Sequence, residues 1–199
     1  MGVRQLIGAI ALWVGLAGSA SAAVTVIADN SAADCSKAAL EKRADDASLQ
    51  FCNQAIDQGA LNRDDLTRTY VNRGAVLMNR HDYDAARADL ERAIQLDPSI
   101  GDTRMNRGAI NIIAHRYAEG IADTTKGLAL GVSEPAKAYF NRAVAYEGVD
   151  DERSAYLDYQ QALVLKPDWE APKRELLRFT VTRRSAPPES VPPSSAKSG

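Results

Sequence analysis

The chain has 199 residues, of which 45% are hydrophobic and 25% are charged, and its formal net charge is −2. This composition allows one modest folded unit and excludes both a wholly disordered chain and a bundle of membrane helices. A weakly acidic chain also lacks the basic surface from which nucleic-acid-binding proteins draw most of their non-specific affinity. Nucleic acid is therefore not an expected partner.

Residues 1–23 have the parts of a secretory signal peptide. Arg4 precedes an apolar stretch over residues 6–16, and Ala20 and Ala22 supply the A-x-A pattern that signal peptidase reads. We expect cleavage after Ala22 or Ala23, a periplasmic or secreted location, and no membrane contact after cleavage. The alternative is a protein anchored by an uncleaved signal, since the charge-free run continues to residue 28 and is then long enough to span a bilayer.

The two cysteines, Cys35 and Cys52, follow within a divergent region over residues 24–66 that we interpret as a first helical hairpin. An oxidising compartment allows cysteines to pair, and a separation of 17 suits facing positions on two antiparallel helices. We predict a disulfide worth about 3 kcal/mol through loop closure. The spacing differs from the C-x-x-C of redox-active pairs.

An internal repeat begins after this region. Thr69–Ala75 returns as Thr103–Ala109 at a shift of 34 residues, and a related segment, Tyr139–Val144, follows after a further 35. Within each unit, apolar and small residues recur at helical spacing in two stretches separated by a polar break. The first and third units end at Pro98 and Pro167, residues that cannot continue a helix. Each unit is thus predicted to be a helical hairpin, with Asp82 and Asp150 as caps of second helices.

Three positions in every unit carry glycine or alanine, as expected where two helices approach closely. They are Gly74, Ala86 and Ala93, then Gly108, Gly120 and Gly127, then Ala143, Ala155 and Ala162. With the terminal proline, which Val132 replaces in the middle unit, this pattern resembles the tetratricopeptide repeat (TPR) family. The resemblance implies an all-α, right-handed α-solenoid of antiparallel hairpins, with units over 67–100, 101–135 and 136–169.

The chain after the repeats divides into two parts. Residues 169–181 are predicted to form a capping helix in which Leu176, Leu177 and Phe179 cover the last hairpin. Residues 182–199 are rich in proline and serine and have too little apolar surface to fold, so a disordered tail is expected.

Each unit also has an arginine followed sixteen residues later by an aspartate. The pairs are Arg73 with Asp89, Arg107 with Asp123, and Arg142 with Asp158. We interpret them as ion pairs between the helices of a hairpin, because a guanidinium suits partly buried bidentate pairing. The alternative is a row of ligand-binding arginines.

In TPR proteins the first helices of successive units line an inner groove, and the resemblance places Asn72, Asn106 and Asn141 along it. A primary amide donates and accepts hydrogen bonds, so a row of amides can bond the backbone of an extended peptide. The alternative is that these asparagines only keep the helix surface soluble. The resemblance also assigns apolar and charged side chains to the same groove. The apolar ones are Val71, Met78, Met105, Ile112, Phe140 and Val144, and the charged ones are Arg68, Asp102 and Lys137.

Some relatives grip a C-terminal carboxylate in this groove. Asn106 and Lys137 match that pattern, but Val71, Ala75 and Asn141 stand where its other polar residues would be. Recognition of a free carboxyl terminus is therefore not expected.

The sequence offers no residue set for catalysis or metal binding. His81 and His115 lie in equivalent turns one repeat apart, without the spacing of a zinc site, and no Gly-rich phosphate loop or GxSxG motif is present. We expect a non-catalytic protein without a cofactor that binds an extended peptide segment of an exported partner in its concave groove. The alternative is a structural accessory subunit of a cell-envelope assembly that docks through its convex face or its ends.

Overall fold

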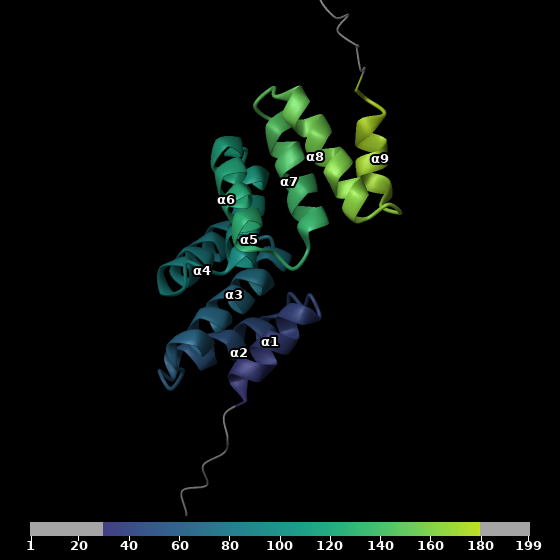
Figure 1. Ribbon diagram of the computed structural model, residues 1–199. Coiled ribbons are helices and arrows are strands. Elements are labelled where there is room, and N and C mark those ends of the chain that lie inside the picture. Colours follow the sequence, from purple (N-terminus) through teal and green to yellow (C-terminus); the bar gives the residue numbers. More distant parts are fainter. Residues whose placement is uncertain (1–29, 180–199) are drawn as a thin grey trace, which may run out of the picture.

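The computed structural model describes residues 30–179, and all regular secondary structure in that range is helical. The helices are α1 Ser31–Leu40, α2 Asp46–Asp57, α3 Arg63–Asn79, α4 Tyr83–Leu96, α5 Gly101–Ile113, α6 Tyr117–Leu130, α7 Pro135–Glu147, α8 Glu152–Leu165 and α9 Glu170–Leu176 (Figure 1). The expected signal peptide over 1–23 and the expected tail over 182–199 lie outside the described residues. None of the helices described here is long and apolar enough to cross a membrane.

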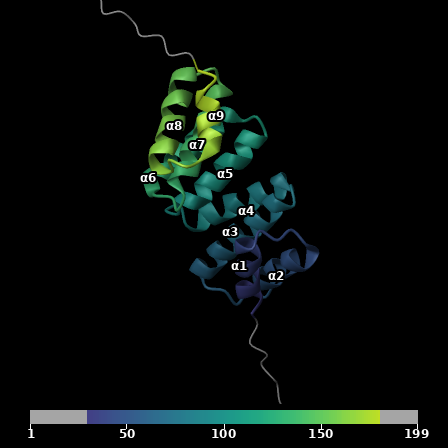
Figure 2. The ribbon, with the colours of Figure 1, turned by 90° about the vertical axis from the view of Figure 1, so that its right-hand side faces the viewer.

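The helices pair in chain order. The most extensive packing joins α1 to α2, α3 to α4, α5 to α6, and α7 to α8, while α9 packs against α8. Figures 1 and 2 show these hairpins stacked in sequence from α1 and α2 at one end to α9 at the other. The predicted all-α fold of stacked hairpins is confirmed. One boundary differs, because α3 begins at Arg63, four residues before the predicted start of the first clear unit.

The small residues lie where the helices touch. Ala86, Ala93, Ala143, Ala155 and Ala162 are all fully buried. The tightest approach is at Gly101, where an added Cβ atom would lie 2.0 Å from the carbonyl oxygen of Gly131. Backbones at this distance leave no space for a side chain.

Each turn within a hairpin contains a residue other than glycine with a positive φ. These residues are Lys42, His81, His115 and Asp150. Asp82, directly after His81, caps α4 by accepting a hydrogen bond from the Ala85 amide, as predicted. The prediction that Asp150 caps α8 is wrong: Asp150 occupies the left-handed position of the turn, and the next residue, Asp151, accepts the capping bond from the Ser154 amide.

The first hairpin contains the Cys35–Cys52 disulfide, whose Cα atoms are 4.8 Å apart. Both cysteines are fully buried and lie in a small core with Ala38 and Val76. The side chains that α1 buries are small, namely those of Ser31, Cys35 and Ala38. The disulfide therefore adds a covalent link to the packing of α1 against α2 and α3.

At the other end, an aromatic cluster fastens the cap. The Phe140 ring lies 4.9 Å from Trp169 and 5.4 Å from Tyr159, measured between ring centroids, and Phe179 packs against Tyr159. Leu176 packs on the same cluster. The expectation for Leu177 is wrong, because this side chain is 86% exposed. The cap helix ends at Leu176, so the chain turns away before Leu177 can face α8.

Candidate functional site

A concave hollow of about 520 Å³ lies along the first helices of the hairpins and is called the groove below. Its walls come from the end of α1, from α3, α5 and α7, and from the loop before α7. It is lined by Ala39, Leu40, Lys42, Val71, Asn72, Ala75, Met78, Asn79, Asp102, Met105, Asn106, Ala109, Ser133, Glu134, Lys137 and Asn141. The groove crosses three repeat units and the first hairpin, so a ligand in it would touch most of the solenoid.

The structure brings Asn72, Asn106 and Asn141 together as lining residues of the groove. Each is partly buried, and none of their side-chain amides has a hydrogen-bond partner within residues 30–179. Two other asparagines of the described chain are used internally, because Asn111 donates to Asp123 and Asn53 accepts from Arg73. The three groove asparagines therefore keep donors and acceptors that the fold itself does not use.

Sequence reasoning missed a fourth asparagine, Asn79, which also lines the groove. It follows Asn72 by seven residues on α3, and residues seven apart lie on the same face of a helix. This spacing is the signal that could have identified it.

The apolar part of the predicted lining is divided between the groove and the core. Val71, Met78 and Met105 line the groove. Ile112 does not, because its side chain packs toward α6 in the space left by Gly120, whose added Cβ would lie 2.6 Å from Ile112 Cγ1. Ile112 therefore packs inside its hairpin, whereas its equivalent in the preceding unit, Met78, faces the groove.

Phe140 and Val144 also lie outside the groove, in the core that joins α7, α8 and the cap. Phe140 occupies the repeat position of Val71 and Met105. No complete hairpin follows α7 and α8 in the described chain, and Trp169 packs against the Phe140 ring instead. The end of the solenoid therefore changes the environment of a position that faces the groove elsewhere.

The first hairpin adds two residues that the repeat pattern did not predict, Leu40 and Lys42. Leu40 is the last residue of α1 and is 80% exposed, although it is a large apolar residue. The Lys42 ammonium has no ion-pair partner among the residues described. The divergence of this hairpin from the later repeats is the reason that pattern matching overlooked both.

The charges at the opposite end of the groove have partners within the protein. Lys137 pairs with Glu134, and the Asp102 carboxylate accepts hydrogen bonds from the amide and the hydroxyl of Ser133 at 2.9 and 3.0 Å. This end carries charges that already have partners, whereas the end formed by α1 combines the exposed Leu40 with the unpaired Lys42.

The three arginines pair with the aspartates sixteen residues later. The shortest nitrogen–oxygen distances are 2.7 Å for Arg73–Asp89, 2.6 Å for Arg107–Asp123 and 2.7 Å for Arg142–Asp158. Each guanidinium uses two nitrogens on both carboxylate oxygens. These hydrogen bonds raise the pKa of each arginine above its usual value. None of the six residues lines the groove, so these charges pair with one another between the helices of each hairpin and do not face a ligand in the groove.

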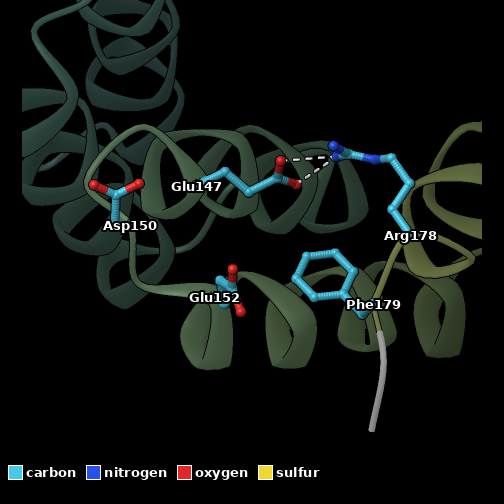
Figure 3. Close-up of a pocket in the computed structure, with 5 residues that line it drawn as sticks. All are labelled: Glu147, Asp150, Glu152, Arg178 and Phe179. Carbon is cyan, nitrogen blue, oxygen red and sulfur yellow. Dashed lines mark hydrogen bonds and ion pairs between the residues drawn. The ribbon is translucent and has the colours of Figure 1, made fainter.

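A second hollow, of about 440 Å³, lies beside the cap and is lined by Glu147, Asp150, Glu152, Arg178 and Phe179 (Figure 3). Arg178 donates to both oxygens of Glu147 at 2.8 and 2.9 Å, which ties the end of the cap to α7. Burial, together with a hydrogen bond to Glu147, raises the pKa of the nearby Tyr159 well above its usual range. A phenol with so high a pKa stays neutral and acts as a packing residue.

The histidines have local roles in their turns. His81 Nδ1 lies 2.8 Å from the Tyr83 hydroxyl, and His115 Nδ1 lies 2.6 Å from the Tyr117 hydroxyl. Across residues 30–179, no group of three or more His, Cys, Asp or Glu side chains is arranged to hold a metal ion.

Residues 67–100 match the family model of the tetratricopeptide repeat. This segment is similar to one tetratricopeptide repeat. The match has the same limits as the first unit predicted from the sequence. No curated protein matches the chain.

Several solved structures, two of them TPR domains, share this fold. The OM64 TPR domain of Arabidopsis is 22% identical with a TM-score of 0.57, and the alignment covers 59% of this chain and 96% of that chain. MamA of Desulfovibrio magneticus RS-1 is 18% identical with a TM-score of 0.63, and the alignment covers 74% of this chain and 81% of that chain. The second TPR domain of human RPAP3, in complex with an HSP70 peptide, is 22% identical with a TM-score of 0.54, and 58% and 96% are covered. These likenesses establish a TPR-type solenoid.

Proposed function

We propose that this protein is a non-catalytic interaction module whose groove binds an extended peptide segment of another protein. One observation carries the proposal: Asn72, Asn106 and Asn141 line a single groove with amides that the fold leaves without partners. An extended backbone presents unpaired N–H and C=O groups, and burying these groups requires hydrogen bonds. A row of primary amides supplies both donors and acceptors to such a backbone.

The comparisons support a peptide as the class of ligand. The RPAP3 domain with a similar fold was solved in complex with an HSP70 peptide. The apolar side chains of Val71, Met78 and Met105 beside the amides add contact area for the side chains of a bound segment.

We further propose that the partner is an exported protein and that the module acts in the periplasm or outside the cell. The signal-like N-terminal sequence supports export. The buried disulfide supports the same location, because disulfides persist in oxidising compartments and are rare in the cytosol.

A second candidate function is that of an accessory subunit of a cell-envelope assembly that docks through its end. This candidate is favoured by a further hollow on α8 and α9, which is lined in part by the apolar residues Leu157, Val164 and Leu176. Leu157 and Val164 are exposed in the described chain, outside the groove. Contiguous exposed apolar surface of this kind marks interaction sites.

The two candidates are separated by capturing partners from an envelope extract on the purified protein. The groove variant changes Asn72, Asn106 and Asn141 to alanine. Its matched control changes three exposed amides to alanine, namely Gln50 and Gln54 on α2 and Gln58 directly after it. The end variant is Leu157→Ser with Val164→Ser, and circular dichroism verifies that all variants remain helical.

A partner that binds the wild type and the control but not the groove variant supports the peptide-binding proposal. A partner that the groove variant retains in full and the end variant loses would refute that proposal in favour of docking through the end.

A further inference from the structure

The groove has charged side chains at both of its ends. At one end, Lys42 lies in the turn between α1 and α2. At the other end, Asp102 lies in the first turn of α5, and Glu134 and Lys137 lie at the start of α7. Lys137 and Glu134 form an ion pair, so these two charges cancel. One charge of each sign therefore remains, Lys42 at the first end and Asp102 at the second.

The Lys42 ammonium is a positive charge without a partner. It is exposed, and it forms no ion pair or side-chain hydrogen bond within the described chain. The other two basic residues of this hairpin are paired, Lys37 with Glu41 and Arg43 with Asp45. Lys42 is thus the basic residue of the first hairpin whose charge is left for a ligand in the groove.

The Asp102 carboxylate is a negative charge without a counterion. It accepts hydrogen bonds from the amide and the hydroxyl of Ser133 at 2.9 and 3.0 Å, and it forms no ion pair with the residues described. Both donors are neutral, so they hold the carboxylate in place and leave its charge uncompensated. A cation of a ligand would find this charge already oriented.

The asparagine amides of the groove do not choose a direction for a bound segment, because each amide both donates and accepts hydrogen bonds and so suits a backbone that runs either way. The two charges do choose one. A segment with an acidic side chain at Lys42 and a basic side chain at Asp102 gains two attractions, whereas the same segment reversed places like charges together.

We infer that the groove selects an extended segment that carries one acidic and one basic side chain, with the acidic one at Lys42 and the basic one at Asp102, and that this charge order fixes the direction of binding. This inference rests on the proposed function and adds the charge pattern of the partner. Lys42 belongs to the first hairpin, outside the segment that matches the TPR family model.

The test selects peptides from a phage-displayed library of random octapeptides on the full protein. The wild type is expected to select peptides with one acidic and one basic residue at a constant separation. Lys42→Glu is expected to select a basic residue in place of the acidic one, and to bind the peptides selected by the wild type about tenfold more weakly. The matched control is Lys126→Glu, which makes the same charge change at an exposed lysine on α6, outside the groove.

The other end is tested by Asp102→Asn, which removes the charge and keeps an oxygen that accepts from Ser133. It is expected to lose the preference for the basic residue and to keep the preference for the acidic one. Its control is Asp84→Asn, an exposed carboxylate in the first turn of α4. Circular dichroism verifies that all variants remain helical.

The direction of binding has its own readout. A zero-length carbodiimide cross-linker condenses a carboxylate with a nearby amine, and mass spectrometry maps the product. With a selected peptide that has both termini blocked, the acidic side chain is expected to cross-link to Lys42. A product at Lys137 in place of Lys42 would show the reverse direction and would overturn the inferred charge order.

The outcomes separate this inference from the proposed function. Selection of peptides without a constant pair of charges, or of the same acidic position by Lys42→Glu, would overturn the charge selection, while loss of binding by the triple asparagine variant would still uphold the groove. Failure of the wild type to select any peptide, or equal binding by the triple asparagine variant, would overturn the proposed function and the charge selection with it.

Discussion

The repeat pattern and the packing predict opposite effects on stability when Gly101 is replaced by alanine. Gly101 is the first residue of its unit, where Thr67 and Ala136 stand in the neighbouring units. The pattern therefore permits alanine, and helix propensity alone favours it by about 1 kcal/mol. The structure opposes it, because the new Cβ would lie 2.0 Å from the Gly131 carbonyl oxygen and 2.6 Å from that of Gly127.

Both opposing atoms belong to the backbone, so no flexible side chain can move aside. Overpacking of this kind costs about 1–3 kcal/mol or more, which outweighs the propensity gain. We expect Gly101→Ala to lower the free energy of unfolding by about 2 kcal/mol and the urea midpoint by about 1 M.

The assay is urea unfolding followed by circular dichroism at 222 nm. The control is the reverse change in the next unit, Ala136→Gly, which loses only propensity and is expected to cost at most about 1 kcal/mol. A midpoint for Gly101→Ala equal to or above that of the wild type would show that the α5 start has room for a side chain, and the packing argument would fail.

Three further predictions concern stability. Asp123→Ala leaves the partly buried Arg107 guanidinium unpaired and is expected to lower the free energy of unfolding by about 3–5 kcal/mol. Arg107→Leu with Asp123→Leu removes both charges and is expected to lower it by less. Thermal melts in which the double variant is the less stable of the two would contradict this. Hydrogen bonds from Ser154 lower the pKa of Asp151 below the ordinary value of 3.8. The ionised carboxylate therefore contributes to the free energy of unfolding above pH 3.8, and this contribution is lost as the pH falls through the lower pKa of the folded state. Asp151→Asn keeps a capping oxygen without a titrating group, so its melting temperature should fall less between pH 6 and pH 3, and an equal fall would count against the cap. Removing the disulfide by Cys35→Ala with Cys52→Ala is expected to cost about 3 kcal/mol in urea unfolding, and an unchanged midpoint would contradict the attachment of α1.

The repeats were predictable because their information is local. A period near 34 residues, with small residues at three positions, specifies which faces of two paired helices meet, and those faces do meet at Ala86, Gly108 and Ala155. The separation of sixteen between Arg107 and Asp123 follows from the same hairpin geometry and is repeated in the units on either side. Asn72, Asn106 and Asn141 occupy the same position in the first helix of successive units. The repeat alone therefore predicts that they lie on one surface, which is the groove.

The chain by itself thus determined the helical hairpins, their limits within a few residues, and the row of asparagines. Only the tertiary structure decided which apolar residues face the groove, because that depends on what lies across from each position. Phe140 sits at a groove position of the repeat but turns into the core because a short cap with Trp169 replaces the next hairpin. Leu40 belongs to no clear repeat and reaches the groove because α1, which a disulfide joins to α2, packs beside α3. The periodicity of a sequence specifies which face of a helix is apolar. It does not specify what packs against that face at the ends of a solenoid, where a cap or a divergent hairpin replaces the next repeat.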